Sequence, residues 1–502
     1  MRLDAPHKPL AGLAEVLTIS APASLSMLNS TIMRFVDGLM VSRTGPAALS
    51  AQFIGGMSAF VPHTLALGIL SLANTYVSQN FGAGRPRRCG QYAWAGIFLA
   101  LILGGALLPL TAVAGPLFGW IGHEEAALEA MYFRYMLITG VFFLASRATE
   151  QFFYGIHRPR TVYVVSLLGN AMNIFLNWVL IYGHFGFAAM GLEGAAIGTL
   201  ISAVAMLGTL LVLFLGRKYA RDFGTRSIRS VTRKQVWDLF RIGWPAGLQL
   251  TNDIFTWLLL SLLLVGPFGQ AHRVAAAAVI RYMSLAFMPS IGVGIAATAL
   301  VGRYIGARKP DIARSRAYTA VAVGLAYSFL CGAVMLIFRV ALLEFFINVQ
   351  EATGAAAEQT TVQSADRVIR IGASLMICGV IYQCFNAVAL IFVRALRGAG
   401  DTVWPMLLTA LLAWGILVGG GLMMVHVWPE LESLGPWIAV CVYGAVLAAV
   451  MARRFMGGRW QELQLIEKDE PPTAALAEAV AEVRPPFART APPVRRTQRD
   501  SS

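Results

Sequence analysis

Long apolar stretches separated by short polar segments make up most of this chain. Most of the stretches have about 20 residues or more, the length of helix that crosses a hydrocarbon layer of about 30 Å. Peptide groups in a membrane must be hydrogen-bonded within their own segment, so we expect helices and not isolated strands. We predict twelve membrane-spanning helices, at residues 14–40, 47–78, 92–115, 130–154, 161–183, 194–216, 240–265, 273–301, 317–338, 369–393, 403–427 and 436–452.

The apolar pattern occurs twice. Near residue 80 the chain reads Q-N-F-G-A-G-R-P, and near residue 304 it reads R-Y-I-G-A-R-K-P. Gly82 and Gly306 are 224 residues apart, and so are Pro86 and Pro310. Each copy has six predicted helices, and this even number gives both copies the same orientation in the membrane. A tandem of two such modules is typical of secondary transporters.

The spacing between the copies grows toward their ends. Residues 160–161 and 401–402, which each open an apolar run, are 241 residues apart. The 17 additional residues fall in the polar stretch from Asn348 to Asp366, which we expect to contain no helix.

The repeat divides the chain into four parts. We expect an N-terminal six-helix lobe at 1–216, a basic cytoplasmic linker at 217–239 and a C-terminal six-helix lobe at 240–456. Residues 457–502 are rich in Pro, Ala, Arg and Glu and have no apolar face, which predicts a disordered tail. The expected fold is an all-α polytopic membrane protein with two parallel six-helix repeats.

Composition and charge agree with a membrane protein. The chain is 57% hydrophobic and 13% charged, whereas about 25% of the residues of a soluble protein are charged. The net charge of +14 would suit nucleic acid, but Lys and Arg gather in the loops on one side of the predicted spans. This asymmetry predicts that both termini are cytoplasmic, and it argues against a nucleic-acid partner. The loops on the other side hold only Arg43, Arg273, Arg339 and Arg367.

Motifs of enzymes and nucleotide-binding proteins are missing from the sequence. It has no G-x-x-x-x-G-K-[ST] loop, no H-E-x-x-H and no cofactor fingerprint. The five cysteines lie in or beside apolar segments, without the spacing of metal ligands. We therefore expect no enzyme activity, no cofactor, no bound nucleotide and no resident metal.

Acidic residues inside predicted membrane helices are the main candidates for chemistry. They are costly there and usually face a cavity or a partner. Burial disfavours the charged form of a carboxylate, so such a group can exchange a proton or hold a cation. Three acids lie well inside the predicted helices: Asp37, Glu150 and Asp253.

Neighbouring arginines leave a second interpretation open. Arg34 precedes Asp37 by three residues, and Arg147 precedes Glu150 by three. Residues at this spacing share a helix face, so each pair could be a fixed ion pair that neutralises both charges. Asp253 has no arginine at helical spacing, but a residue from another helix, such as Arg281, could still pair with it.

Polar residues also line the predicted fifth and sixth helices. Asn173 and Asn177 are one turn apart, and Thr199 lies near the start of the next helix. They could join neighbouring helices by hydrogen bonds or provide oxygen ligands for an ion. The matching positions in the second half, Trp414 and Val418, are not polar, so an ion site would be confined to the first half.

Several motifs resemble the MATE (multidrug and toxic compound extrusion) family, in order, from about residue 12 to 456. They are F-V-D-G-L-M-V around Asp37, S-Q-N-F-G-A-G-R-P from Ser78, N-I-F-L-N-W-V-L-I-Y-G from Asn173, G-L-E-G-A-A-I-G-T after it, V-G-R-Y-I-G-A-R-K-P from Val301 and L-R-G-A-G-D-T from Leu396. The resemblance implies two lobes in a V and antiport by alternating access. Sodium ions or protons would enter while an organic, often cationic and amphipathic, compound leaves.

The resemblance also implies roles for single residues. Asp37 matches the carboxylate that couples cation entry, and Asn173, Asn177 and Thr199 match other members of that site. Asp253 matches an acid of the second lobe used for cation or drug binding. The further candidates for that second site are Asn252, Asn386 and Glu150.

Two departures from the family pattern bear on the coupling ion. Many members have Asp in place of Asn177, and many have an acid in place of Asn386. A Na⁺ site at Asp37 with one carboxylate should be weaker than one with two, which favours protons. We expect a monomer in a bacterial inner membrane that acts on small organic substrates. A flippase for lipid-linked saccharides or other lipids, from the same broad superfamily, is the alternative, and the arginines Arg34, Arg147 and Arg281 keep it open.

Overall fold

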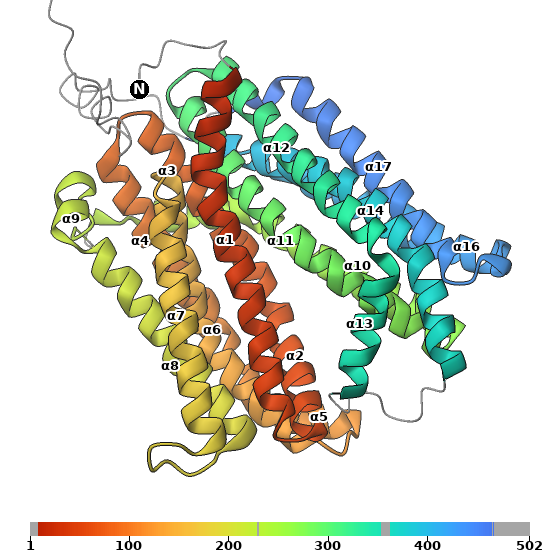
Figure 1. Ribbon diagram of the computed structural model, residues 1–502. Coiled ribbons are helices and arrows are strands. Elements are labelled where there is room, and N and C mark those ends of the chain that lie inside the picture. Colours follow the sequence, from red (N-terminus) through yellow and green to blue (C-terminus); the bar gives the residue numbers. More distant parts are fainter. Residues whose placement is uncertain (1–8, 228–229, 353–361, 464, 466–502) are drawn as a thin grey trace, which may run out of the picture.

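The computed structural model describes residues 9–227, 230–352, 362–463 and 465, and this part of the chain contains helices and no strand (Figure 1). Twelve helices in it are long and apolar enough to cross a membrane, as expected. The spans of the first repeat are α1 (Pro9–Ser42), α2 (Pro46–Leu70) continued by α3 (Leu72–Gly82), α4 (Pro86–Leu107), α6 (Ala126–Gly155), α7 (Pro159–Tyr182) and α8 (Gly191–Phe214).

The second repeat has the same order of spans, with more interruptions. Its spans are α10 (Arg233–Leu259) with the π-helical turn η2 (Leu260–Val265), α11 (Gln270–Gly306), α12 (Pro310–Ile337), α14 (Val362–Ala399), α15 (Val403–Leu412) with η4 (Ala413–Gly420) and α16 (Gly421–Val427), and α17 (Leu434–Met456). The shorter helices are α5 (Leu110–Ile121), α9 (Arg217–Phe223), η3 (Gly266–Phe268), α13 (Arg339–Ala352), η5 (Pro429–Leu431) and η6 (Arg459–Gln461).

The expectation of a helix-free stretch from Asn348 to Asp366 is wrong at both ends. Helix α13 continues to Ala352, and α14 already begins at Val362. Glu, Gln and Ala, which are frequent there, are good helix formers although they are not all apolar. Residues 353–361 lie outside the described part.

The chain stays packed on the second lobe for a short distance beyond α17. Trp460 is fully buried, and its ring stacks on Phe455 with the centroids 4.5 Å apart. The rest of the predicted disordered tail, from 466 to 502, lies outside the described residues.

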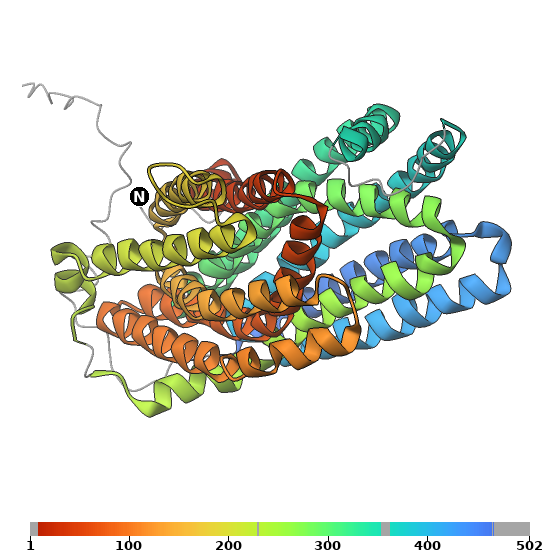
Figure 2. The same ribbon diagram turned by 90° about the horizontal axis from the view of Figure 1, so that it is seen from below.

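The helices form two lobes arranged as a V (Figure 1). Helices α1–α8 make one arm and α10–α17 the other, and the view from below shows the two groups side by side (Figure 2). Where α2 crosses α10, the backbones touch at Gly68 and Gly247, so that a Cβ atom on Gly68 would collide with the Gly247 backbone. Small residues allow this close approach, as in many membrane helix pairs.

Polar contacts join the lobes at the end where α1 begins and α3, α11 and α14 finish. Gln79 Nε2 donates to the carbonyl of Gly398 at 3.0 Å, and Thr75 Oγ1 donates to the carbonyl of Arg397 at 3.0 Å. The Arg397 guanidinium in turn donates to Ser71 Oγ at 3.1 Å and to Gln249 Oε1 at 3.2 Å. The V is therefore closed at this end, and its arms diverge toward the other end (Figure 1).

Candidate functional site

The structure brings together the four polar residues predicted in the first lobe. Asn177 Nδ2, from α7, donates to Asp37 Oδ1 of α1 and, at 3.3 Å, to Asn173 Oδ1. Asn173 Nδ2 donates to Thr199 Oγ1 of α8 at 3.4 Å. The Asn pair faces both helices because residues four apart share one side of a helix.

This first-lobe cluster, consisting of Asp37, Asn173, Asn177 and Thr199, leaves acceptor capacity unused. Asn177 Oδ1 is buried and has no hydrogen-bond partner in the structure. Gly198 makes room for this oxygen, since a Cβ atom at residue 198 would collide with it. A carboxylate with amide and hydroxyl oxygens is a donor set for a proton or for a small hard cation.

The Asp37 carboxylate is half-buried and has no ion-pair partner among the described residues. Arg34 does not neutralise it; its guanidinium instead donates to Thr31 Oγ1 at 3.2 Å. The fixed ion pair considered for Asp37 from the sequence is therefore absent. Tyr132 of α6, which the sequence did not single out, lies within electrostatic range of Asp37.

Glu150 differs from Asp37 because its arginine does pair with it. Arg147 Nη1 donates to Glu150 Oε2 at 2.9 Å within α6, and Glu150 is 1% exposed. The fixed ion pair that the sequence left open is therefore present at Glu150. The structure places this residue in the first lobe, apart from the α10 and α14 residues with which the sequence grouped it.

Asp253 lies on α10, half-buried, and its carboxylate makes no hydrogen bond or close ion pair within the part of the chain that the structure describes. Arg281 is exposed on α11 and does not reach it. The charged groups within electrostatic range of Asp253 are Arg394 and Arg397 of α14. The two arginines therefore compensate the Asp253 charge through space, without a direct ion pair.

Asn252 and Asn386 are half-buried, like Asp253. Asn252 Oδ1 accepts a hydrogen bond from Trp414 Nε1 at 3.0 Å, and its Nδ2 atom is buried and has no hydrogen-bond partner in the described part of the chain. One turn before Asn386, Gln383 is 2% exposed, and neither of its amide atoms has a hydrogen-bond partner within the described ranges. The sequence analysis missed Gln383, although its spacing of three residues from Asn386 places both on one face of α14.

A second set of charged residues missed by the sequence analysis joins the lobes near the start of α1. Glu15 accepts hydrogen bonds from Arg316 Nε at 2.7 Å and from the Tyr304 hydroxyl at 2.8 Å. Nearby, Arg303 Nη1 lies 3.2 Å from His157 Nδ1, and His157 Nε2 lies 3.3 Å from the carbonyl of Ala299.

His157 stands in the short turn between α6 and α7, outside the spans. Burial and, to a smaller extent, the Arg303 guanidinium lower the pKa of its imidazole to about 3. His157 is thus neutral near pH 7. The two contacts fit one tautomer, in which Nδ1 accepts from Arg303 and Nε2–H donates to Ala299.

The MatE family model matches residues 22–179 and 251–419, which is more than half of the chain. The matched ranges include Asp37, Asn173 and Asn177 of the first-lobe cluster, and they also include Asn252, Asp253 and Asn386. The chain belongs to the MATE family. It is 29% identical over 450 residues to the probable multidrug resistance protein NorM of Burkholderia pseudomallei, covering 88% of this chain and 92% of that protein. It is 24% identical over 465 residues to the NorM protein of Thermotoga maritima, covering 91% and 94%.

Solved structures of membrane transporters have the same fold. A MOP superfamily transporter from Pyrococcus furiosus superposes with a TM-score of 0.79 at 21% identity, covering 90% of this chain and 96% of that one. An outward-facing MATE transporter superposes with a TM-score of 0.78 at 19% identity, covering 89% and 96%. With its twelve candidate spans, this MATE chain is a multi-pass membrane transporter and not an enzyme.

Proposed function

We propose that this MATE transporter is a proton-coupled antiporter that exports organic cations by alternating access, with Asp37 as the coupling residue. The observation that carries the proposal is the half-buried Asp37 carboxylate, which has no ion-pair partner among the residues that the structure describes. It lies beside Asn177 Oδ1, which also lacks a hydrogen-bond partner there. A charge in this position is costly, and binding a proton or a cation removes the cost.

The polar residues around Asp37 would set how tightly the ion is held. The Asn177 amide donates to one carboxylate oxygen and so holds the Asp37 side chain toward α7. Neutralising Asp37 would remove this charge from the face of α1 toward α7 and α8, and would let the first lobe change its packing. The cluster holds one carboxylate, which supports protons over Na⁺ as the coupling ion.

We place substrate binding in the second lobe, around Asp253. The aromatic rings of Phe255 and Trp414 lie near each other, 6.1 Å between centroids, and both side chains are exposed. A carboxylate without a close partner, the amide of Asn252 and exposed aromatic faces suit an organic cation, since cations are attracted to aromatic rings. The NorM relatives are named multidrug resistance proteins, which supports an export function of this kind.

The positive-inside pattern supports placing the closed end of the V in the cytoplasm, with both termini. The conformation would then be open to the outside of the bacterial inner membrane, ready to release substrate and to take up a proton. We propose that the monomer transports, because both candidate sites lie within one chain.

The experiment is uptake of a fluorescent organic cation into liposomes that contain the purified protein, under an imposed pH gradient and then under an imposed Na⁺ gradient. We expect the pH gradient to drive transport in the wild type. Asp37→Asn should lower gradient-driven transport at least about tenfold and leave substrate binding near the wild-type level, since an amide cannot titrate.

In contrast to Asp37→Asn, Asp253→Asn should weaken the binding of the fluorescent organic cation and raise the KM of its transport. Glu193→Gln is the matched control, because Glu193 is an exposed acid on α8 that bonds only to the Tyr135 hydroxyl in the structure. Undiminished pH-driven transport by well-folded Asp37→Asn would refute the coupling role.

A further inference from the structure

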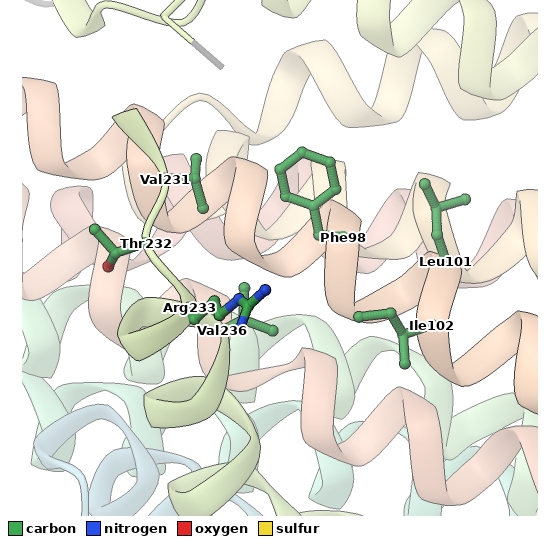
Figure 3. A pocket seen from close by; sticks show the side chains of 7 residues that line it. All are labelled: Phe98, Leu101, Ile102, Val231, Thr232, Arg233 and Val236. Atoms are coloured by element: carbon green, nitrogen blue, oxygen red, sulfur yellow. The ribbon is translucent and has the colours of Figure 1, made fainter. Parts of the chain in front are cut away.

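A groove on the outer surface lies where the two lobes are joined by the linker. Phe98, Leu101 and Ile102 of α4 form one wall, and Val231 and Val236 at the start of α10 form the other (Figure 3). The groove has a volume of about 430 Å³. We call it the α4–α10 groove.

The lining is apolar except at one edge, which Thr232 and Arg233 form (Figure 3). Thr232 is already engaged, because its side chain and that of Gln235 cap the first turn of α10 reciprocally. The Arg233 guanidinium is exposed and has no hydrogen bond or ion pair within the described residues. The positively charged Arg233 side chain therefore lies at the edge of an apolar groove and is free to bind an anion.

The exposed face of α10 indicates how deep in the membrane the groove lies. Arg233 is followed at helical spacing by Trp237, Trp244 and Leu248, which are 58%, 41% and 45% exposed. Basic residues followed by tryptophan and then by aliphatic residues mark the passage from the headgroup layer into the hydrocarbon. The groove thus lies where a phospholipid has its phosphate and the first part of its acyl chain.

The two walls belong to different lobes, since α4 is part of the first and α10 of the second. A hydrogen bond from Gln235 Nε2 to Gln91 Oε1 at 3.0 Å joins the two walls. A change in the angle of the V would move α10 relative to α4 and change the shape of the groove. A ligand that fits this shape would therefore favour the present conformation.

We propose that the α4–α10 groove binds an anionic glycerophospholipid, with an acyl chain along the apolar walls and the phosphate at Arg233. Bound lipid stabilises the conformation in which the V is closed at the end where α1 begins. The proposal rests on the chain being a membrane transporter and is independent of the coupling ion and of the substrate.

The test uses the full-length protein in detergent, titrated with phosphatidylglycerol or with phosphatidylcholine of the same acyl chains. Native mass spectrometry counts the bound lipid, and hydrogen exchange follows the amides at the ends of α3 and α11, where the lobes meet. We expect the wild type to bind phosphatidylglycerol about tenfold more tightly, and this lipid to slow exchange at both helix ends.

Arg233→Gln should abolish the preference between the two lipids and the slowed exchange, and Ile102→Trp should weaken the binding of both lipids. Arg241→Gln is the matched control, an exposed arginine on α10 that does not line the groove. Glycerol phosphate, which has no acyl chain, should not compete. A wild-type preference in Arg233→Gln, equal binding of both lipids by the wild type, or competition by glycerol phosphate would each overturn the proposal.

Discussion

The Asn177 side chain contacts two other residues of the first-lobe cluster and a glycine beside it. Its amide nitrogen reaches Asp37 and Asn173, and its oxygen lies against Gly198 of α8. The position of this amide therefore depends on the absence of a side chain at residue 198, which gives a test of the cluster that leaves every titrating group in place.

Gly198→Ala should displace the Asn177 amide and break its hydrogen bond to Asp37. We expect pH-driven transport to fall at least about fivefold, because an unpaired buried polar group costs roughly 1–3 kcal/mol. The measurement is the liposome uptake described above. Gly208→Ala on the same helix is the control, since nothing lies within 4 Å of the added methyl group there. Equal transport by the two variants would show that the Asn177 contact does not matter.

The sequence predicted which residues gather at this site better than it predicted their partners. Asp37, Asn173 and Asn177 could be placed together because helical spacing and family resemblance both point to one site. Spacing of three residues puts Arg34 and Asp37 on one face, as it does Arg147 and Glu150, but only the second pair forms. Whether such a pair forms depends on the side-chain rotamers and on the helices packed around it. Neither can be read from a single sequence.

The helices were predicted well, but their boundaries were predicted less well. The apolar pattern predicted all twelve spans, but it placed the start of the seventh at residue 240, whereas α10 begins at Arg233. The first turns of α10 are polar and are started by the Thr232–Gln235 capping box, which hydropathy does not detect. Contacts between the lobes, such as the hydrogen bond from Gln79 to Gly398, could not be predicted from the sequence, because they depend on how the two repeats pack against each other.

The crossing of α2 with α10 is a contact between the lobes that depends on glycine. Ala in place of Gly usually stabilises a helix by about 1 kcal/mol. At Gly68 the collision with the α10 backbone outweighs this gain. We expect Gly68→Ala to lower the thermal unfolding midpoint in detergent and to speed hydrogen exchange in both helices.

Gly105→Ala in α4 provides the comparison, because its added methyl group has open space around it. Its midpoint should stay unchanged or rise. A Gly68→Ala midpoint equal to that of Gly105→Ala would mean that the crossing adapts, and that it does not fix the angle between the lobes.

For the whole molecule, alternating access requires the contacts at the closed end to break. Glu15 binds α11 and α12 from the first lobe through Tyr304 and Arg316, and its carboxylate lies 3.8 Å from Arg303 Nη1. Arg303 also bonds to the turn that holds His157. These contacts are polar, so water can replace each of them when the lobes separate.

His157 makes this closed end sensitive to pH. Its pKa is lowered from 6.5 to about 3 by burial and by Arg303, so the closed state disfavours the protonated ring. Once the lobes separate and the ring is hydrated, its pKa should return toward 6.5. Proton binding then favours the separated state, and closure is weakened as the pH falls below about 6.5, by on the order of 1 kcal/mol per pH unit.

Hydrogen exchange at the ends of α3 and α11 should therefore quicken between pH 7 and pH 5, after correction for the intrinsic exchange rate. His157→Gln, which keeps a donor and an acceptor but cannot titrate, should flatten this dependence. Glu15→Gln separates the contribution of the neighbouring carboxylate, because that variant retains His157 and should keep most of the pH dependence. If His157→Gln keeps the wild-type pH dependence, His157 does not make the closed end sensitive to pH.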